Sequence, residues 1–325
     1  TDEEYLNHKL HSWESFISYA ALPNDKYLLN WPMRANDFPT TKDIYDAVGD
    51  RTKFYKKMKQ HTLNYVHYMQ TTLGHPEWGI AEDEFPTEDF LPFIPYVRES
   101  RRVKGVTLMK ENDVVPYDGT NRPRFRVDSV AVGDYFLDHH HSSMFKEPSE
   151  RLIEKLPANA PFQIPIGALI PEQNDGLICA EKSISVTHIV NGCTRLQPVV
   201  MLIGQAAGVI AALSVEQDIH PRDVNFREVQ ETLIDQGCQV FPYKDIYRNT
   251  ELFKPVQKLA SLAIIAHDAD YNFSPEQKVT EKEIHDWVHL LPLTKTIQDA
   301  FIVALKGRTR GETFKHLYLA VLHSC

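Results

Sequence analysis

The chain has 325 residues, of which 42% are hydrophobic and 24% are charged. These proportions are close to those of soluble globular proteins, which argues against disordered and fibrous classes. The chain carries 35 Lys and Arg against 44 Asp and Glu, a formal charge of −9. We therefore predict no nucleic-acid partner, because phosphate binding needs concentrated basic residues.

The first long element that the sequence predicts is a helix from about residue 50 to residue 73, which Gly74 ends. Its apolar residues recur near helical spacing: Phe54, Met58, Leu63, Val66 and Met69. Several prolines follow within residues 76–95, so we expect an extended, loop-like stretch there.

Strands are predicted next, at residues 103–109, 125–137 and 161–171. Residues 176–185 also begin with the pattern of a short buried strand. Together with the helices, these strands predict an α+β fold.

A helix is predicted over residues 198–214, and it is apolar almost all round, so we expect it to be buried. We predict no membrane span, because this run is shorter than the roughly 20 residues needed and contains Gln205. Residues 222–237 read as an amphipathic helix that ends at Gly237, and residues 249–325 read as two or three short helices.

The densest polar cluster runs from Arg98 to Arg102 and contains three arginines. Guanidinium groups bind carboxylates or phosphates through paired hydrogen bonds, so Arg98 and Arg101 are candidates for orienting an anionic group. On a strand Arg98 and Ser100 would share one face. The alternative is a solvated edge strand with local ion pairs.

Histidines form two further clusters. Asp138 is followed by three consecutive histidines, but successive strand residues point to opposite faces, so at most two of them could converge on a metal. His285 and His289 lie one helical turn apart without a supporting carboxylate pair. We favour surface or structural histidines in both places and predict no metal site.

The start of the helix at residues 198–214 is a candidate binding site. Thr194 can cap this helix, and Pro198 is tolerated in its first turn. A helix N-terminus presents backbone N–H groups and a partial positive charge, to which Arg195 adds a full charge. Small residues, namely Gly204, Ala207, Gly208 and Ala211, would let another backbone approach closely. The alternative is a tightly packed core helix with no ligand.

Residues 176–214, from Gly176 to Ser214, closely resemble the carboxyl-terminal flavin motif of the FAD dependent oxidoreductases, some of which are called xanthan lyase-like. In that motif a strand is followed by a Ser-x-x-His segment, an Arg and a helix with Gly-Gln-Ala-Ala-Gly. Residues 79–105 and 126–141 resemble the middle region of the same family. The resemblance runs from about Asn30 to Gln236.

The resemblance implies hydride or electron transfer through FAD, an α/β fold for the intact protein and a small-molecule substrate, possibly related to carbohydrate. It implies that His188 and Arg98 act on the substrate. It implies cofactor contacts from several further residues: Arg101, Glu181, Ser185, Thr194, Arg195, Pro198 and Gln205. The helix start near Thr194 to Pro198 would face the pyrimidine edge of the flavin, where negative charge develops on reduction.

The family's flavin domain begins with a glycine-rich strand-turn-helix, and this sequence has no two glycines separated by a single residue. We therefore expect the carboxyl-terminal part of such a protein, inactive by itself. The chain starts at Thr1 without an initiator Met or an apolar signal core. Either a leader has been removed, which implies a periplasmic or exported protein, or the chain begins inside a longer one.

The last block resembles S-layer homology modules. Residues 252–288 contain a helix, a turn with Asn-Phe-x-Pro and a Val-Thr-x-x-Glu sequence that opens a second helix, and residues 309–321 look like a partial echo. The alternative is a generic helical cap. A second functional hypothesis follows, a carbohydrate-binding or cell-wall-associated module without redox activity.

We predict three parts. Residues 1–160 form a substrate-domain-like region with a mixed sheet, residues 161–246 the carboxyl-terminal part of an FAD-binding domain, and residues 247–325 a small helical module.

Overall fold

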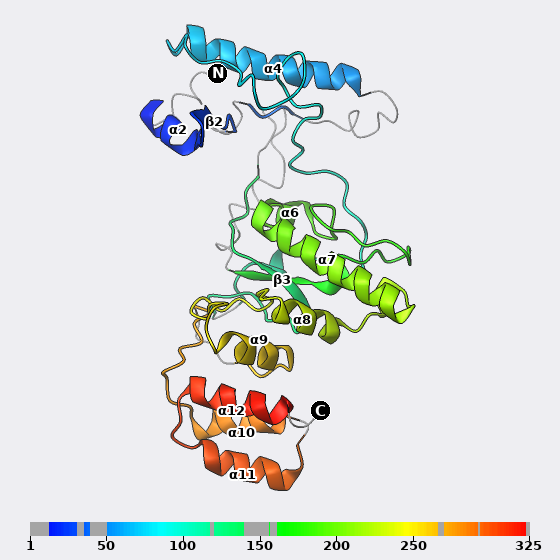
Figure 1. Cartoon of the computed structure of the whole chain (residues 1–325), viewed down its shortest axis with the longest axis vertical. Coiled ribbons are helices and arrows are strands. Elements are labelled where there is room, and N and C mark those ends of the chain that lie inside the picture. The colour runs from blue at the N-terminus through cyan, green and yellow to red at the C-terminus, as the bar shows by residue number, and fades with distance from the viewer. Residues whose placement is uncertain are drawn as a thin grey trace. The chain divides into compact units, whose positions relative to one another are not determined.

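A computed structural model describes residues 13–30, 36–39, 51–117, 120–139, 156, 161–265, 270–291 and 293–322. The fold is α+β with a carboxyl-terminal helical block, which confirms the predicted fold class (Figure 1). The chain divides into two compact units. The first contains residues 1–98 and 139–154, and the second contains residues 99–138 and 155–325. The predicted division into three parts stays a prediction.

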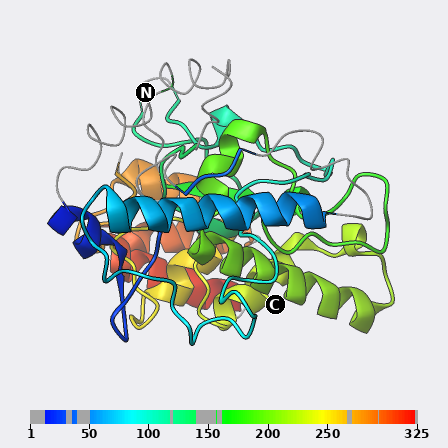
Figure 2. The same ribbon diagram turned by 90° about the horizontal axis from the view of Figure 1, so that it is seen from above.

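The first unit is built around helix α4 (Thr52–Thr71), which is straight over its length (Figure 2). Its limits agree with the predicted helix, and Gly74, with a φ of 80°, lies just beyond its end. Helix α2 (Trp13–Ala20) and the hairpin of β1 (Ala21–Leu22) and β2 (Lys26–Tyr27) precede it. The two helices form a small core, made of Phe16, Ala20, Tyr65 and Met69.

The sheet of the second unit pairs β3 (Ser129–Gly133) antiparallel with β4 (Phe162–Pro165). Strands were expected at both places but over longer ranges. The ladder is short because a 3-10 turn, Ile166–Ala168, begins directly after β4. Both sheets in the described residues are two-stranded and antiparallel.

Two predicted strands are wrong. Residues 103–109 form only isolated bridges, from Gly105 to Pro171 and from Met109 to Val186. Residues 176–185 form no strand, because their backbone bonds the 3-10 turn instead: the Ser185 N–H donates to Ala168 and the Cys179 N–H to Leu169. An apolar run can satisfy its backbone against a turn as well as against a strand, and local pattern does not distinguish the two.

Three helices cover this sheet: α6 (His188–Thr194), α7 (Gln197–Gln217) and α8 (Phe226–Asp235) (Figure 1). Helices α7 and α8 both contact β3. Helix α8 begins later than predicted, because Asn225 caps it after a 3-10 turn. Gly237, with a φ of 81°, ends this helix region as predicted.

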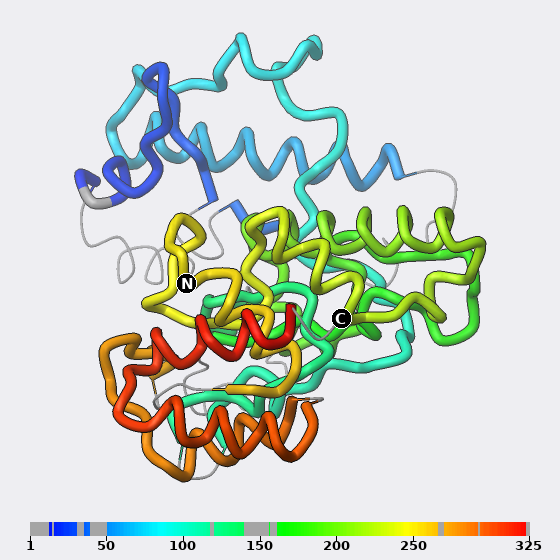
Figure 3. The backbone as a smooth tube through the Cα atoms, turned by 60° about the horizontal axis from the view of Figure 1, so that its bottom comes forward, coloured from blue at the N-terminus to red at the C-terminus, as the bar shows by residue number. Residues whose placement is uncertain are grey.

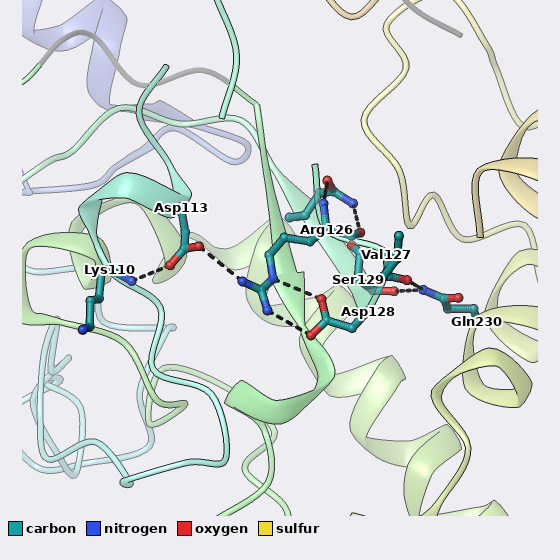
Figure 4. Close-up of polar contacts among 8 residues, drawn as sticks. Lys110, Asp113, Arg126, Val127, Asp128, Ser129 and Gln230 are labelled. Atoms are coloured by element: carbon teal, nitrogen blue, oxygen red, sulfur yellow. Dashed lines mark hydrogen bonds and ion pairs between the residues drawn. The ribbon is translucent and has the colours of Figure 1, made fainter. Parts of the chain in front are cut away.

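Polar contacts fix the approach to β3 (Figure 4). The Arg126 guanidinium contacts Asp113 at 3.3 Å and Asp128 at 3.0 Å. The Gln230 amide on α8 donates to the carbonyls of Val127 and Ser129 at 2.7 and 2.8 Å. Gln230 is fully buried, so these bonds hold α8 against the start of the strand.

The carboxyl-terminal block contains four helices in the described residues, where two or three were expected (Figures 1 and 3). They are α9 (Phe253–Ser261), α10 (Glu281–His289), α11 (Lys295–Leu305) and α12 (Arg310–Leu322). Helix α9 packs against both α8 and α12. The block therefore continues the packing of the second unit.

The echo noted in the sequence has a structural counterpart. Thr280 caps α10 and exchanges hydrogen bonds with Glu283. Thr309 and Glu312 exchange the same pair of bonds at the start of α12. The two turns pair antiparallel between Lys278 and Thr309. Helices α10 and α12 of the block thus begin with matching caps.

Two glycines of the second unit should respond oppositely to a methyl group. A Cβ on Gly105 would lie 2.6 Å from the Ser185 Cβ and 2.8 Å from the Gly167 carbonyl oxygen. A Cβ on Gly208, inside α7, would meet nothing within 4 Å. We expect Gly105→Ala to destabilise the protein by about 1–3 kcal/mol. Gly208→Ala should stabilise it by about 0.5–1 kcal/mol, because alanine restricts the unfolded chain.

Urea unfolding of both variants measures these differences. Equal midpoints for Gly105→Ala and the parent protein would show that the backbone near Gly105 yields without cost.

Candidate functional site

Helix α6 begins with a well-anchored turn. The Thr187 hydroxyl oxygen accepts the Val190 N–H at 3.2 Å, which caps the helix. The same hydroxyl donates to the Glu111 carboxylate at 2.7 Å. His188 is the first residue of the helix and directly follows this cap. The position of its backbone is therefore fixed by two hydrogen bonds at the preceding residue.

The His188 ring contacts a carboxylate from a distant part of the chain. Its Nδ1 lies 2.7 Å from Glu99 Oε1, although the two residues are 89 positions apart. The same Glu99 oxygen forms an ion pair with Arg102 Nη1. The His188 side chain is 40% exposed, whereas Glu99 and Arg102 are each 23% exposed. A solute can thus reach part of the ring, but Nε2 itself is buried, and the acidic group is mostly covered.

Arg195 follows α6 and is one of the few buried charged residues in the described part of the chain, with 5% of its surface exposed. Its Nη2 donates to the Asp138 carboxylate at 2.6 Å and to the Asp138 carbonyl at 3.2 Å. Two hydrogen bonds to one residue hold the guanidinium in a single orientation. The cation stays close to the start of α7 for this reason.

The cap of α7 differs from the expectation. Leu196, with an extended backbone, is its N-cap residue, and no side chain caps the helix. Thr194 belongs to α6, where its hydroxyl donates to the Val190 carbonyl at 3.3 Å. The predicted Thr194 cap is wrong, because a separate short helix ends there. Pro198 does lie in the first turn of α7, as predicted.

A cavity of about 1050 Å³ lies at this helix start. Helix α7 contributes Pro198, Val199 and Leu202 to its walls. The chain after β3 contributes Tyr135, and residues 237–249 form much of the remaining wall. Most of the lining is apolar, so a flat ring could be covered there, next to the N–H groups of the first helical turn.

The other predicted site residues are dispersed. Arg98 belongs to the first unit, where its Nε is 3.4 Å from Asp37. Residues 98–104 form no strand, so the expected sharing of a face by Arg98 and Ser100 is wrong. Arg101 and Glu181 are exposed.

Ser185 and Gln205 differ strongly in burial. Ser185 is fully buried, and its hydroxyl makes no hydrogen bond within the described residues. Gln205 lies on the exposed side of α7 and donates to Gln236 at 3.0 Å.

The small residues of α7 pack only in part as expected. Ala207 is buried, as are Val199, Ile203 and Ile210, and a Cβ on Gly204 would lie 3.5 Å from the Ala180 carbonyl oxygen. Gly208 and Ala211 are exposed, and Met201 and Val215 keep 74% and 81% of their surface exposed. The expectation of a helix buried all round is therefore wrong, and contact of the small face holds only for Gly204 and Ala207. Helix α7 is long and apolar enough to span a membrane, but its inner side is core here.

The sequence does not reveal the acidic partners of His188 and Arg195. Glu99 lies within the arginine cluster, and Asp138 precedes the histidines as a possible metal ligand. No spacing rule connects either carboxylate with its partner, 89 and 57 residues away. Only the acidity of Glu99 between basic residues was visible, and that pattern also fits a local ion pair.

The pair of His285 and His289 and the buried thiol of Cys193 offer little further chemistry. His285 and His289 are exposed, and their rings stack with centroids 4.0 Å apart. This agrees with the predicted surface position of these histidines. His140 and His141 lie outside the described residues. Burial raises the pKa of the Cys193 thiol to about 12, so its thiolate form is scarce at neutral pH.

Comparison with known families agrees with the resemblance in the sequence. The FAD dependent oxidoreductase family matches residues 1–233, and the S-layer homology domain matches residues 242–284. No curated protein and no solved structure matches significantly. The first match covers more than half of the sequence. The chain therefore belongs to the FAD dependent oxidoreductase family and carries an S-layer homology domain after the oxidoreductase region.

Proposed function

We propose that these residues form the flavin-ring side of an FAD-dependent oxidoreductase that acts on a small molecule, possibly one related to carbohydrate. The observation that carries the proposal is the cavity at the first turn of α7, whose lining includes Leu196, the residue that follows Arg195 in the sequence. The apolar walls suit a flavin ring, and the positive helix end suits the pyrimidine edge.

The residues fit one end of FAD only. The ring end has a cavity, backbone donors and a nearby cation. The diphosphate end has no counterpart, since the sequence contains no glycine-rich turn of the G-x-G-x-x-G type. We propose that polypeptide outside these residues supplies that turn. The exposed apolar and small residues of α7, such as Met201 and Gly208, would then pack against it.

When bound, FAD would supply hydride or electron transfer. The Arg195 cation and the first N–H groups of α7 would stabilise negative charge near the ring. His188, whose side chain is 40% exposed but whose Nε2 is buried, would exchange a proton with the substrate. Arg98 and Arg101 would orient an anionic group of the substrate or of the cofactor.

The remaining residues would contact the cofactor, with different support from the structure. Pro198 lines the cavity, and Thr194 lies shortly before Pro198 in the sequence. Ser185 offers a buried hydroxyl. Glu181 and Gln205 lie at the surface, where only a further polypeptide or a long cofactor would reach them.

The expected result for the isolated chain is weak FAD binding or none, because the diphosphate cradle is absent. Titration of the purified chain with FAD, followed by quenching of flavin fluorescence, measures this. The product of the complete gene should instead retain flavin through purification. Stoichiometric binding by the chain alone would contradict the division of the site, and a colourless complete product would contradict the function.

The second candidate function is attachment to the cell wall, possibly through carbohydrate, with no redox activity. The S-layer homology domain favours it and also supports an exported, surface-associated bacterial protein. Co-sedimentation of the chain with purified bacterial cell walls tests attachment. If the complete product binds cell walls and also retains flavin, it has both functions. If it binds cell walls without flavin, attachment is its only function of the two.

A further inference from the structure

The starting observation is the contact between His188 and Glu99 in the second unit. The Nδ1–Oε1 distance of 2.7 Å is that of a strong, charge-assisted hydrogen bond. The contact joins the first residue of α6 to a segment 89 residues earlier. Nothing in the family match assigns a role to Glu99.

Two neighbours of His188, Glu99 and Arg102, define the chemistry of this contact. A carboxylate can only accept hydrogen bonds, so a neutral His188 ring must carry its proton on Nδ1 to donate to Glu99. Arg102 pairs with the same carboxylate and favours its ionised form. The proton of the neutral ring is therefore directed to Nδ1, and Nε2 becomes the ring atom that can accept a proton.

The backbone anchor makes this geometry persistent. Thr187 is held by its bonds to Val190 and to Glu111, so His188 cannot turn with its backbone. The ring is then fixed from two directions, by the cap on one side and by Glu99 on the other. The contact is partly exposed, so its role here is orientation of the ring rather than a large gain in stability.

We propose that Glu99, supported by Arg102, is a positioning residue that fixes His188 as the Nδ1–H tautomer. The catalytic consequence rests on the proposed function of His188. The tautomer itself does not, since it depends only on residues of the second unit. A histidine held in this way has one defined proton-accepting atom, Nε2, which is buried here. Second-sphere carboxylates fix the ring orientation of other functional histidines in the same way.

The test measures the tautomer directly. The full chain, labelled with nitrogen-15 in histidine, is studied by long-range proton–nitrogen NMR at a mildly alkaline pH without flavin. The signals that disappear in the His188→Gln variant are those of His188. We expect the Nδ1–H form to predominate in the parent protein. Glu99→Gln should shift the tautomer ratio towards Nε2–H on the order of tenfold, the difference between a charge-assisted and a neutral hydrogen bond.

Two further variants complete the design. Arg102→Gln should shift the ratio in the same direction by a smaller factor, because Glu99 remains. Glu111→Gln is the matched control: it removes the charge of a nearby carboxylate that contacts Thr187 and not His188. The glutamine amide oxygen can still accept the Thr187 hydroxyl, so the backbone anchor remains and the ratio should not change. Circular dichroism checks that each variant is folded.

A parent protein in which the Nε2–H form predominates would overturn the proposal. So would a folded Glu99→Gln variant with an unchanged ratio, and, if that variant does not fold, an unchanged ratio in Arg102→Gln. Because the measurement contains no flavin, failure of the proposed redox function would leave the tautomer result unaffected. A confirmed tautomer with a flavin-free complete gene product would retain the geometry and remove its catalytic role.

Discussion

Replacing Arg195 by methionine should destabilise the second unit by roughly 3–5 kcal/mol, the range observed when one member of a buried ion pair is removed. The side chains of Arg195 and Asp138 are only 7% and 12% exposed. The variant would leave the Asp138 carboxylate buried without its cation. The free energy of unfolding, from urea titration followed by circular dichroism, measures the loss.

A double variant separates the pair from its surroundings. Arg195→Met combined with Asp138→Leu removes both charges, so much of the lost stability should return. Lys282→Ala is the control, because Lys282 and Asp286 form an exposed pair, 84% and 52% exposed, and such pairs contribute about 0–1 kcal/mol. If Arg195→Met lowered the free energy of unfolding no more than Lys282→Ala does, the ion pair of Arg195 with Asp138 would not stabilise the second unit.

The second large effect is expected at Gln257, which lies on α9 and is fully buried. Its amide oxygen accepts the N–H groups of Val240 and Phe241 at 3.0 and 2.9 Å, and its amide nitrogen donates to the Phe241 carbonyl at 2.9 Å. Gln257→Leu would leave two buried backbone N–H groups unpaired, whereas the Phe241 carbonyl keeps bonds from the Tyr243 N–H and the Gln239 amide. At about 1–3 kcal/mol for each unpaired group, the total loss should be at least about 2 kcal/mol.

Gln217→Leu is the matched control, since Gln217 bonds Glu228 at the exposed end of α7 and its loss should cost under about 0.5 kcal/mol. Thermal unfolding of both variants gives the comparison. Gln257 lies in the region that matches the S-layer homology domain, whereas Val240 and Phe241 precede it. A Gln257→Leu variant as stable as the parent would show that the domain is an independent appendage. The expected loss would show that it supports the oxidoreductase region.

The contact between α8 and α9 gives this expectation further support. Lys258 pairs with Glu231 and Asp235 across the two helices, at 2.9 and 3.0 Å. Lys254 also pairs with Asp235, at 3.0 Å. These are partly exposed pairs of modest strength, so they add little to the buried apolar residues of α9 and to the Gln257 amide.

The sequence predicted features whose cause is local. Helix α4 follows from a repeat of apolar residues and ends before a glycine that adopts a positive φ. Thr280 and Glu283 predict the start of α10, because each satisfies a backbone or side-chain group three residues away. The two family matches have the same origin, since both depend on motifs read along the chain.

The sequence was less reliable where a segment must find a distant partner. Residues 103–109 have a strand-like pattern, yet they find only single bridging partners. The apolar residues of α7 predicted burial, but only tertiary packing selected which side is buried and left Met201 and Gly208 outside. A pattern that is apolar all round carries no information on the contacting side.

The amino-acid sequence by itself determined the α+β class, the flavin-linked family and the helices whose caps and apolar repeats are local. Only the tertiary structure decided which charges meet: Arg195 with Asp138 across 57 residues, and His188 with Glu99 across 89. The physical reason is that such pairs form between segments brought together by burial of the shared core. The pairing energy of two distant side chains leaves no periodic trace in either segment, whereas a cap or an apolar stripe does.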